Sequence, residues 1–167
     1  RSVLTILVFI PILMVNIGGI KKMLAGDIQI GKYRSEILKT VSQVEPSLTN
    51  KNVFYFFTDH TGFYEFQSGF GQTLAVYFYD TDQIPKEVLI DRDFWDSSYE
   101  GLKNFNDKKF GYVMSYDKLL ETLKNNQDIQ LSSVHSFYWD FQKHTVRDVS
   151  DEIREKLNRD LKNAKKS

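Results

Sequence analysis

The chain has 167 residues, no cysteine, and 22 basic against 22 acidic side chains, so its formal net charge is zero. Without cysteine, a disulfide framework and a cysteine-ligated zinc or iron–sulfur site are excluded. Nucleic-acid binding requires a basic surface that neutralises phosphates, and this balance of charge does not favour one, so no nucleic-acid partner is expected.

The first predicted element covers Ser2–Ile20, an uninterrupted run of uncharged and mostly apolar residues. As an α-helix this run would be roughly 28 Å long, close to the ~30 Å hydrocarbon core of a bilayer. Its apolar residues surround the helix, and the run is longer than the apolar part of a signal peptide. The pattern therefore predicts a transmembrane helix within residues 1–22, with the lipid bilayer as a partner.

The second predicted element is an amphipathic connecting helix over residues 23–46. Apolar and aromatic side chains recur there at helical spacing, at Tyr33, Ile37, Val41 and Val44. Pro46 disfavours helical geometry at the residue before it, which sets the end of the helix. We expect this helix to pack on the sheet that follows. A helix lying on a membrane surface is the alternative, and the narrow apolar stripe favours it less.

Residues 47–167 are predicted to form one mixed α/β (α+β) domain around a central, aromatic-rich sheet. Runs of β-branched and aromatic residues predict strands at Val53–Thr58, Phe110–Ser115 and Val134–Phe141, with Thr145–Val149 as the hairpin partner of the last. Leu74–Tyr79 fits either a strand or a short helix, and we favour a strand. Two helices are expected. One is capped by Asp117, with Leu119, Leu120 and Leu123 facing inward, and the other is capped by Ser150, with Ile153, Leu157, Leu161 and Ala164 along one side.

Aromatic residues make up 14% of the chain and cluster between Val53 and Tyr79. Such side chains suit the half-buried surface of a sheet, which favours a role in the core. A platform for a carbohydrate or a peptide is the alternative.

Asp80 and Asp82 form an Asp-x-Asp pattern, which sugar-nucleotide transferases use to hold a divalent cation through oxygen ligands. The same residues occur in turns, where carboxylates accept hydrogen bonds from nearby backbone N–H groups. We favour the turn, and we expect neither a metal site nor a cofactor. His135 and His144 could approach one another across the predicted hairpin, but they would lack a third metal ligand.

Asp91 and Asp93 flank Arg92, so two carboxylates lie beside one guanidinium group. This composition suits acid–base chemistry or binding of a sugar hydroxyl, and it is equally typical of a solvated loop. With Trp95 and the Asp80/Asp82 pair, they complete the set of candidate binding residues. The sequence contains no nucleophile elbow, phosphate-binding loop or His-Glu-x-x-His motif. It therefore assigns no catalytic residue.

Several short stretches resemble the C-terminal tail of uncharacterised multi-spanning bacterial membrane proteins, which are similar to integral-membrane, lipid-linked-sugar glycosyltransferases. These stretches are Phe66–Gly71, Gln72-Thr73-Leu74, Ile84-Pro85, Phe94-Trp95-Asp96, Tyr99-Glu100-Gly101 and Phe110-Gly111-Tyr112. The resemblance implies an extracytoplasmic accessory domain of the cell envelope with a recognition or structural role. Its implied partners are upstream transmembrane helices of the same protein and a glycan or another envelope component. No catalytic residue is carried over.

Two other functions stay open: a single-pass, membrane-anchored binding or interaction module, and a small membrane-anchored enzyme using Asp80 and Asp82. The side of the membrane is also divided between two arguments. Basic residues follow the predicted span closely, at Lys21, Lys22, Lys32 and Arg34, which favours a cytoplasmic domain. The resemblance favours an extracytoplasmic one. We follow the resemblance, because charge bias is summed over all the loops of a multi-spanning protein.

Overall fold

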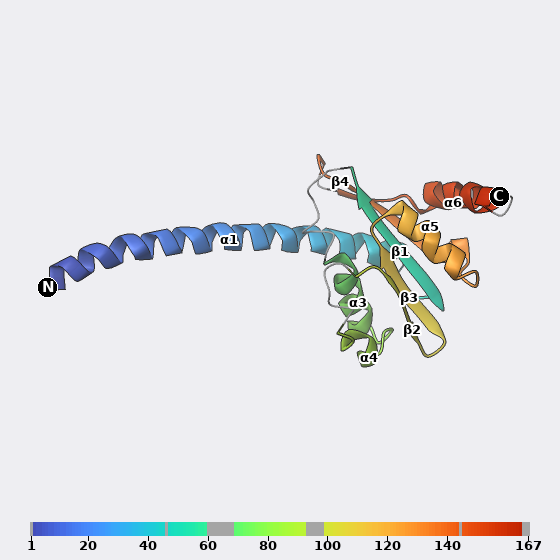
Figure 1. Ribbon diagram of the computed structural model, residues 1–167, viewed down its shortest axis with the longest axis horizontal. Helices are drawn as coiled ribbons and strands as arrows, with labels where there is room; N and C mark the ends of the chain where they lie inside the picture. Colours follow the sequence, from blue (N-terminus) through green and yellow to red (C-terminus); the bar gives the residue numbers. More distant parts are fainter. Residues whose placement is uncertain (1, 46, 60–68, 93–98, 144, 165–167) are drawn as a thin grey trace. The chain divides into compact units, whose positions relative to one another are not determined.

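Figure 1 shows the computed structural model of the chain, which describes residues 2–45, 47–59, 69–92, 99–143 and 145–164. The chain divides into two compact units, Arg1–Ser35 and Glu36–Ser167. The helices and strands follow in the order α1 (Ser2–Val44), β1 (Lys51–Thr58), α3 (Phe70–Asp80), α4 (Lys86–Leu89), β2 (Gly101–Phe105), β3 (Lys108–Val113), α5 (Tyr116–Asn125), the 3₁₀ helix η2 (Leu131–Ser133), β4 (Val134–Asp140), β5 (Thr145–Asp148) and α6 (Ser150–Ala164).

Helix α1 continues without a break from Ser2 to Val44. From Asn16 onwards, where its side chains are described, it carries Lys21, Lys22 and Asp27 within three turns. No helix in the described part of the chain is both long enough and apolar enough to cross a bilayer. The expected transmembrane helix over Ser2–Ile20 is therefore wrong. From Asn16 onwards, where the side chains are described, Lys21, Lys22 and Asp27 interrupt the apolar residues, so this part of the helix offers no apolar run of spanning length.

Five strands form one mixed sheet in the order β2-β3-β1-β4-β5. The central strand β1 pairs in parallel with β3 and β4, while the outer strands β2 and β5 pair antiparallel with their neighbours. Five consecutive residues of β1, from Asn52 to Phe56, are buried, as expected for a parallel strand covered on both faces. The expected α+β domain with a central aromatic-rich sheet is confirmed.

One face of the sheet, here called the aromatic face, is covered by α3 and by the part of α1 from Glu36 onwards (Figure 1). Its rings come from both the sheet and α3: Phe54, Phe56, Phe70, Phe78 and Phe110. The ring centroid of Phe54 lies 5.7 Å from that of Phe78 and 5.8 Å from that of Phe110. The centroids of Phe56 and Phe70 are 4.5 Å apart. All five rings are buried, so these aromatic residues form core and not an exposed platform.

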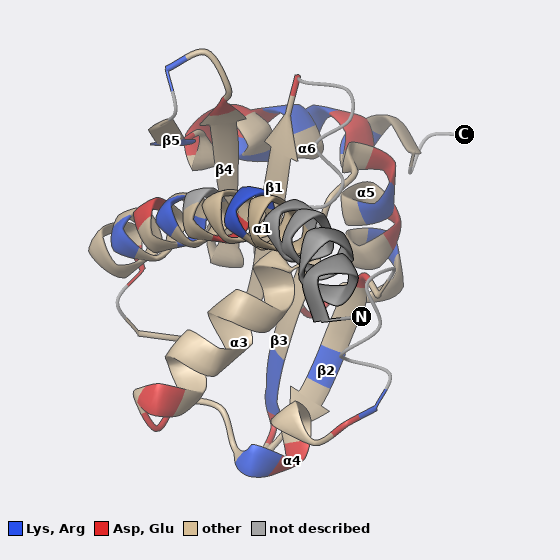
Figure 2. Ribbon diagram, turned by 90° about the vertical axis from the view of Figure 1, so that its left-hand side faces the viewer, with Lys and Arg blue, Asp and Glu red and all other residues tan. Residues whose placement is uncertain are grey.

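The expected strand at Leu74–Tyr79 is wrong, because these residues belong to helix α3. Phe70, Leu74 and Phe78 recur every four residues and are buried, which is the spacing of one helical face. Val76 and Tyr79 point away from that face and are exposed. The helix is uncharged until Asp80, as its tan colour shows (Figure 2). Burial against the aromatic sheet therefore overrides the strand preference of its residues.

The other face, here called the aliphatic face, is covered by α5 and α6 (Figure 1). Its core consists of Val53, Tyr55, Val113, Leu119, Leu123, Ile129, Val134 and Leu157. Residues of β1 alternate between the two faces, because successive side chains of a strand point in opposite directions.

The remaining predictions mostly agree with the structure. Strands at the expected positions of β1, β3 and the β4–β5 hairpin are confirmed, as is the C-terminal helix α6. Helix α5 begins one residue before the predicted cap: Ser115, not Asp117, caps it, since its Oγ accepts a hydrogen bond of 3.2 Å from the Lys118 backbone N–H. The short helix α4 and strand β2 were not predicted.

Candidate binding site

The Asp80/Asp82 pair lies in a turn at the end of α3. Asp80 is the last helical residue, and Asp82 has a φ of 58°, in the left-handed region that Asp tolerates. Backbone N–H groups of Asp82 and Gln83 donate to the carbonyls of Tyr79 and Phe78, at 2.9 and 2.8 Å. Both carboxylates are exposed. The pair therefore lies in a turn closed by backbone hydrogen bonds, and among the described residues it belongs to no cluster of acidic or histidine side chains that could hold a metal ion.

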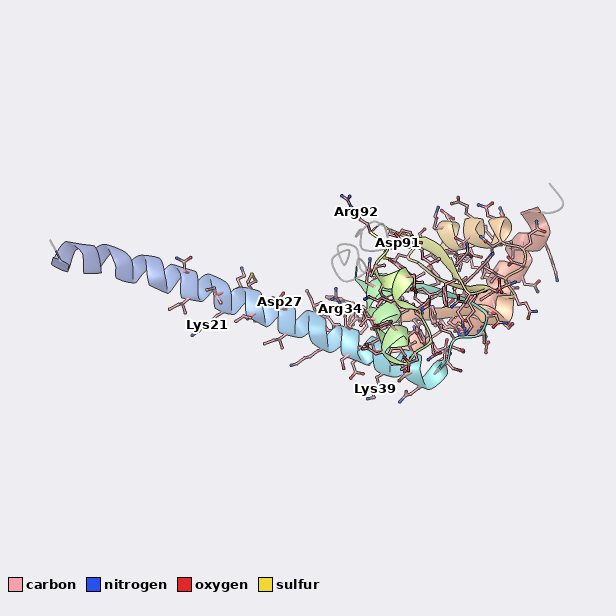
Figure 3. All side chains as sticks on the ribbon, turned by 90° about the horizontal axis from the view of Figure 1, so that it is seen from below. Lys21, Asp27, Arg34, Lys39, Asp91 and Arg92 are labelled. Carbon is pink, nitrogen blue, oxygen red and sulfur yellow. The ribbon has the colours of Figure 1, made fainter. Side chains whose placement is uncertain are left out.

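Asp91 lies in the segment that precedes β2 (Figure 3). Its carboxylate pairs with the Lys103 ammonium at 2.5 Å. Asp93 and Trp95 lie outside the described residues, as does His144. Within the ranges that the structure describes, no group of three or more His, Asp or Glu side chains could hold a metal ion. The sequence-predicted binding residues that can be located are thus not brought together into one site.

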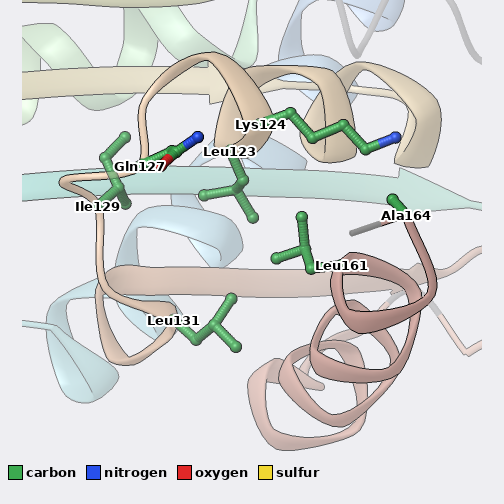
Figure 4. Close-up of a pocket in the computed structure, with 7 residues that line it drawn as sticks. All are labelled: Leu123, Lys124, Gln127, Ile129, Leu131, Leu161 and Ala164. Atoms are coloured by element: carbon green, nitrogen blue, oxygen red, sulfur yellow. The ribbon is translucent and has the colours of Figure 1, made fainter. Parts of the chain in front are cut away.

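A pocket of about 310 Å³ lies instead between the ends of α5 and α6 (Figure 4). Its lining residues come from α5, the segment after it, η2 and α6: Leu123, Lys124, Gln127, Ile129, Leu131, Leu161 and Ala164. Four aliphatic side chains, those of Leu123, Ile129, Leu131 and Leu161, point toward the same space (Figure 4). This is a concave, largely apolar site with two polar residues at its rim.

The pocket is the place where the core of the aliphatic face reaches the surface. Leu123 and Ile129 belong to that core, and Leu131 and Leu161 are partly buried side chains packed against it. The polar side chains Lys124 and Gln127 are exposed. An apolar side chain that entered the pocket would therefore contact these core residues. Polar residues next to it would lie beside the Lys124 ammonium.

The segment after α5 forms one wall of the pocket and is held by hydrogen bonds. The Asn126 side-chain amide donates to the Thr122 carbonyl at 2.9 Å, which closes the end of α5. Asp128 accepts from the Lys51 ammonium at 2.9 Å and from the Lys109 ammonium at 3.0 Å. These hydrogen bonds lower the pKa of Asp128 to about 2. The wall is thus tied to the first residues of β1 and to β3.

Helices α5 and α6 are also tied to each other and to the sheet. The Tyr116 hydroxyl donates to the Asp160 carboxylate at 2.7 Å, and the Lys156 ammonium lies 3.6 Å from the centre of the Tyr116 ring. Burial, followed by the Asp160 hydrogen bond, raises the pKa of Tyr116. Arg154 donates from Nε to the Val134 carbonyl at 2.9 Å. The spacing of the two helices around the pocket is therefore fixed before anything binds.

A buried polar cluster lies under the aromatic face, where sequence reasoning did not place one. The Asn52 side-chain amide is 3.1 Å from Nε2 of His135, and the Thr49 hydroxyl donates to Asn52 Oδ1 at 2.6 Å. The His135 ring stacks on Phe54 with centroids 5.3 Å apart. Glu45 approaches His135 Nε2 to 3.6 Å.

Burial shifts the pKa values of both His135 and Glu45. Burial, and then the positive charge of Arg154, lower the pKa of His135 to about 4. Burial also raises the pKa of Glu45. The imidazole is therefore neutral near pH 7, and its contact with Glu45 is not an ion pair. The His135 ring is thus neutral, stacked on Phe54 and only 5% exposed, so it is part of the core of the aromatic face.

The pocket was only partly visible in the sequence. The apolar spacing of the C-terminal helix predicted that Leu161 and Ala164 lie on its inward side, and Leu123 was expected to face inward from α5. The missed signal is the alternation after Asn126, where Ile129 and Leu131 stand between polar residues. That alternation brings two aliphatic side chains beside the helices.

No protein-family model, curated protein or solved structure matches the chain.

Proposed function

We propose that residues 36–167 form an accessory recognition domain that binds a partner polypeptide in the pocket between α5 and α6. The observation that carries the proposal is the pocket itself, in which the core of the aliphatic face opens to the surface. Binding sites are typically concave and mostly apolar, with a few polar groups that set orientation. The resemblance to glycosyltransferase-like membrane proteins supports the accessory role. It also suggests that the partner polypeptide is a component of glycan assembly.

The occupant that fits best is a large apolar side chain next to a carboxylate. A volume of about 310 Å³ lies at the lower end of the range of ligand pockets and suits one or two apolar side chains. Lys124 stands at the rim, and Lys162 lies in the last turn of α6. These cations favour an acidic residue beside the apolar anchor. The lining offers burial to an apolar side chain and charge pairing to a carboxylate.

A selection experiment tests the proposal. A random peptide library is panned against the full chain, and the enriched peptides are titrated into wild type and two variants by calorimetry. We expect the enriched peptides to share a Leu, Phe or Trp next to Asp or Glu. The variant Leu161→Glu should abolish their binding, because it places a charge in the pocket. Ile90→Glu is the matched control, since Ile90 is 67% exposed and lies outside the pocket.

Peptides that bind Leu161→Glu and wild type equally well would contradict the proposal. No observation favours the alternative of an enzyme that uses Asp80 and Asp82, because both carboxylates lie in an exposed turn.

A further inference from the structure

Helix α1 exposes a narrow apolar stripe within the unit Arg1–Ser35. The side chains of Ile17, Ile20, Leu24 and Ile28 are between 44% and 59% exposed. Their spacing of three, four and four residues places them within an arc of about 80° at 3.6 residues per turn. Exposed aliphatic residues on one helical face, over several turns, are typical of a surface that another helix covers.

Charged residues flank this stripe in an ordered way. Asp27 lies about 60° to one side of its centre, while Lys21 and Lys32 lie about 60° and 80° to the other side. Figure 3 labels Lys21 and Asp27 along this stretch of α1. In the part of the chain that the structure describes, none of these three side chains forms an ion pair. Between Ile17 and Lys32, the stripe thus has an acidic residue, Asp27, on one border and two basic residues, Lys21 and Lys32, on the other.

This distribution of charge discriminates between the ways in which two copies of α1 can pair. In a parallel pair, one border of each helix meets the opposite border of its partner. Asp27 of one copy then lies beside Lys32 of the other, five residues further along, which is the usual offset of such pairs. In an antiparallel pair, like borders meet, so that lysines face lysines. The charges therefore favour parallel pairing.

We propose that the stripe Ile17, Ile20, Leu24 and Ile28 is a homodimer interface, in which α1 pairs in parallel with α1 of a second copy. The pair is two-fold symmetric, so each Asp27–Lys32 contact occurs twice and the assembly closes at two copies. This interface is independent of the pocket between α5 and α6.

Cysteine cross-linking tests the geometry directly, because the chain has no cysteine of its own. Single-cysteine variants are made in the full chain at Ile20, Leu24 and Ile28, and disulfide formation is followed on non-reducing gels. A parallel pair places each residue opposite its own copy, so all three variants should give a disulfide-linked dimer. Met23→Cys and Gly26→Cys are the controls. Met23 is 62% exposed, and both residues lie away from the stripe, so these variants should stay largely unlinked.

Three outcomes would overturn the proposal. Linkage at Leu24 alone would indicate an antiparallel pair, and equal linkage at the stripe and the control positions would indicate non-specific association. The third is absence of linkage together with protection of the stripe cysteines from maleimide by phosphatidylcholine vesicles. That result would show that lipid covers the stripe.

A charge swap provides the second test. Asp27→Lys should weaken self-association measured by sedimentation velocity about fivefold, because it replaces two attractive exposed contacts by repulsive ones. The double variant Asp27→Lys with Lys32→Asp should restore it. Equal dissociation constants for the wild type, the single variant and the double variant would contradict the parallel arrangement.

Discussion

The two faces of the sheet share the central strand β1 but close in different ways. On the aromatic face, large rings from β1, β3 and α3 contact one another and leave no exposed ring among Phe54, Phe56, Phe70, Phe78 and Phe110. On the aliphatic face, smaller side chains pack under α5 and α6 and end in a pocket. The aromatic face is thus closed by its rings, while the aliphatic face ends in the pocket where we propose that a partner binds.

The largest expected effect comes from removing a ring at the centre of the aromatic face. Phe54→Ala should lower the free energy of unfolding by about 4 kcal/mol, since it removes contacts with Phe78, Phe110 and His135 and leaves a cavity. Leu119→Ala, at an equally buried position on the aliphatic face, should cost about 3 kcal/mol. Urea unfolding of both variants measures the difference. If Phe54→Ala lost less unfolding free energy than Leu119→Ala, the ring contacts of the aromatic face would contribute less to stability than the structure indicates.

The close approach of α3 to the sheet gives the second prediction. A Cβ atom added at Gly71 would lie 1.9 Å from the Tyr112 ring. Gly71→Ala should therefore destabilise the fold by about 3 kcal/mol through overpacking, as measured by the shift in the urea midpoint.

Gly26→Ala is the matched control for this overpacking. Gly26 is also helical but has nothing within 4 Å of an added Cβ, so its replacement should be neutral or stabilising by up to about 1 kcal/mol. If Gly71→Ala behaved like Gly26→Ala, α3 would not contact the sheet as closely as the structure describes.

The buried histidine makes the aromatic face sensitive to acid. The pKa of His135 is about 4 in the fold against an ordinary value of 6.5, so the unfolded chain binds more protons between these values. Stability is therefore fully present above pH 6.5 and falls as the pH drops toward 4. At about pH 5 the loss relative to about pH 7.5 should be about 2 kcal/mol.

The raised pKa of Glu45 acts in the opposite sense and offsets part of this loss near its own titration. Urea titrations at several pH values measure the slope, and His135→Gln should remove most of it. A slope that survives this substitution would assign the acid sensitivity to another group.

Sequence patterns predicted the sheet better than they predicted α3 or the site. The runs that form β1, β3 and the β4–β5 hairpin are rich in β-branched and aromatic residues. This composition indicates strands without reference to the rest of the fold. In α3, Leu74–Tyr79 carries the same residue types, and only burial against Phe54 and Phe110 decides for a helix. Local preference does not contain that tertiary contact.

The candidate site was hidden for a related reason. Asp80 and Asp82 matched a chemical motif, but the structure places them in an exposed turn. The pocket has no motif at all, because it forms where Ile129 and Leu131 meet Leu161, which is thirty residues away along the chain. The transmembrane prediction rested on the apolar run Ser2–Ile20, and it is contradicted because no helix in the described part of the chain is long and apolar enough to cross a membrane.

The smallest expected effect tests where on α6 the buried core of the aliphatic face ends and the solvent-accessible pocket begins. Leu157 and Leu161 lie one turn apart on α6; Leu157 is fully buried, while Leu161 is partly exposed at the pocket. Leu157→Ala should cost about 3 kcal/mol of unfolding free energy, as for a core leucine. Leu161→Ala should cost only about 1 kcal/mol, because water already reaches that side chain and little new cavity forms. Urea unfolding of the two variants gives the ratio of their losses of unfolding free energy.

Equal losses in the two variants would mean that the pocket is filled in solution, either by a rearranged segment of the chain or by a bound molecule. A small loss at Leu161, combined with loss of peptide binding in Leu161→Glu, would separate the role of this residue in recognition from its role in the fold.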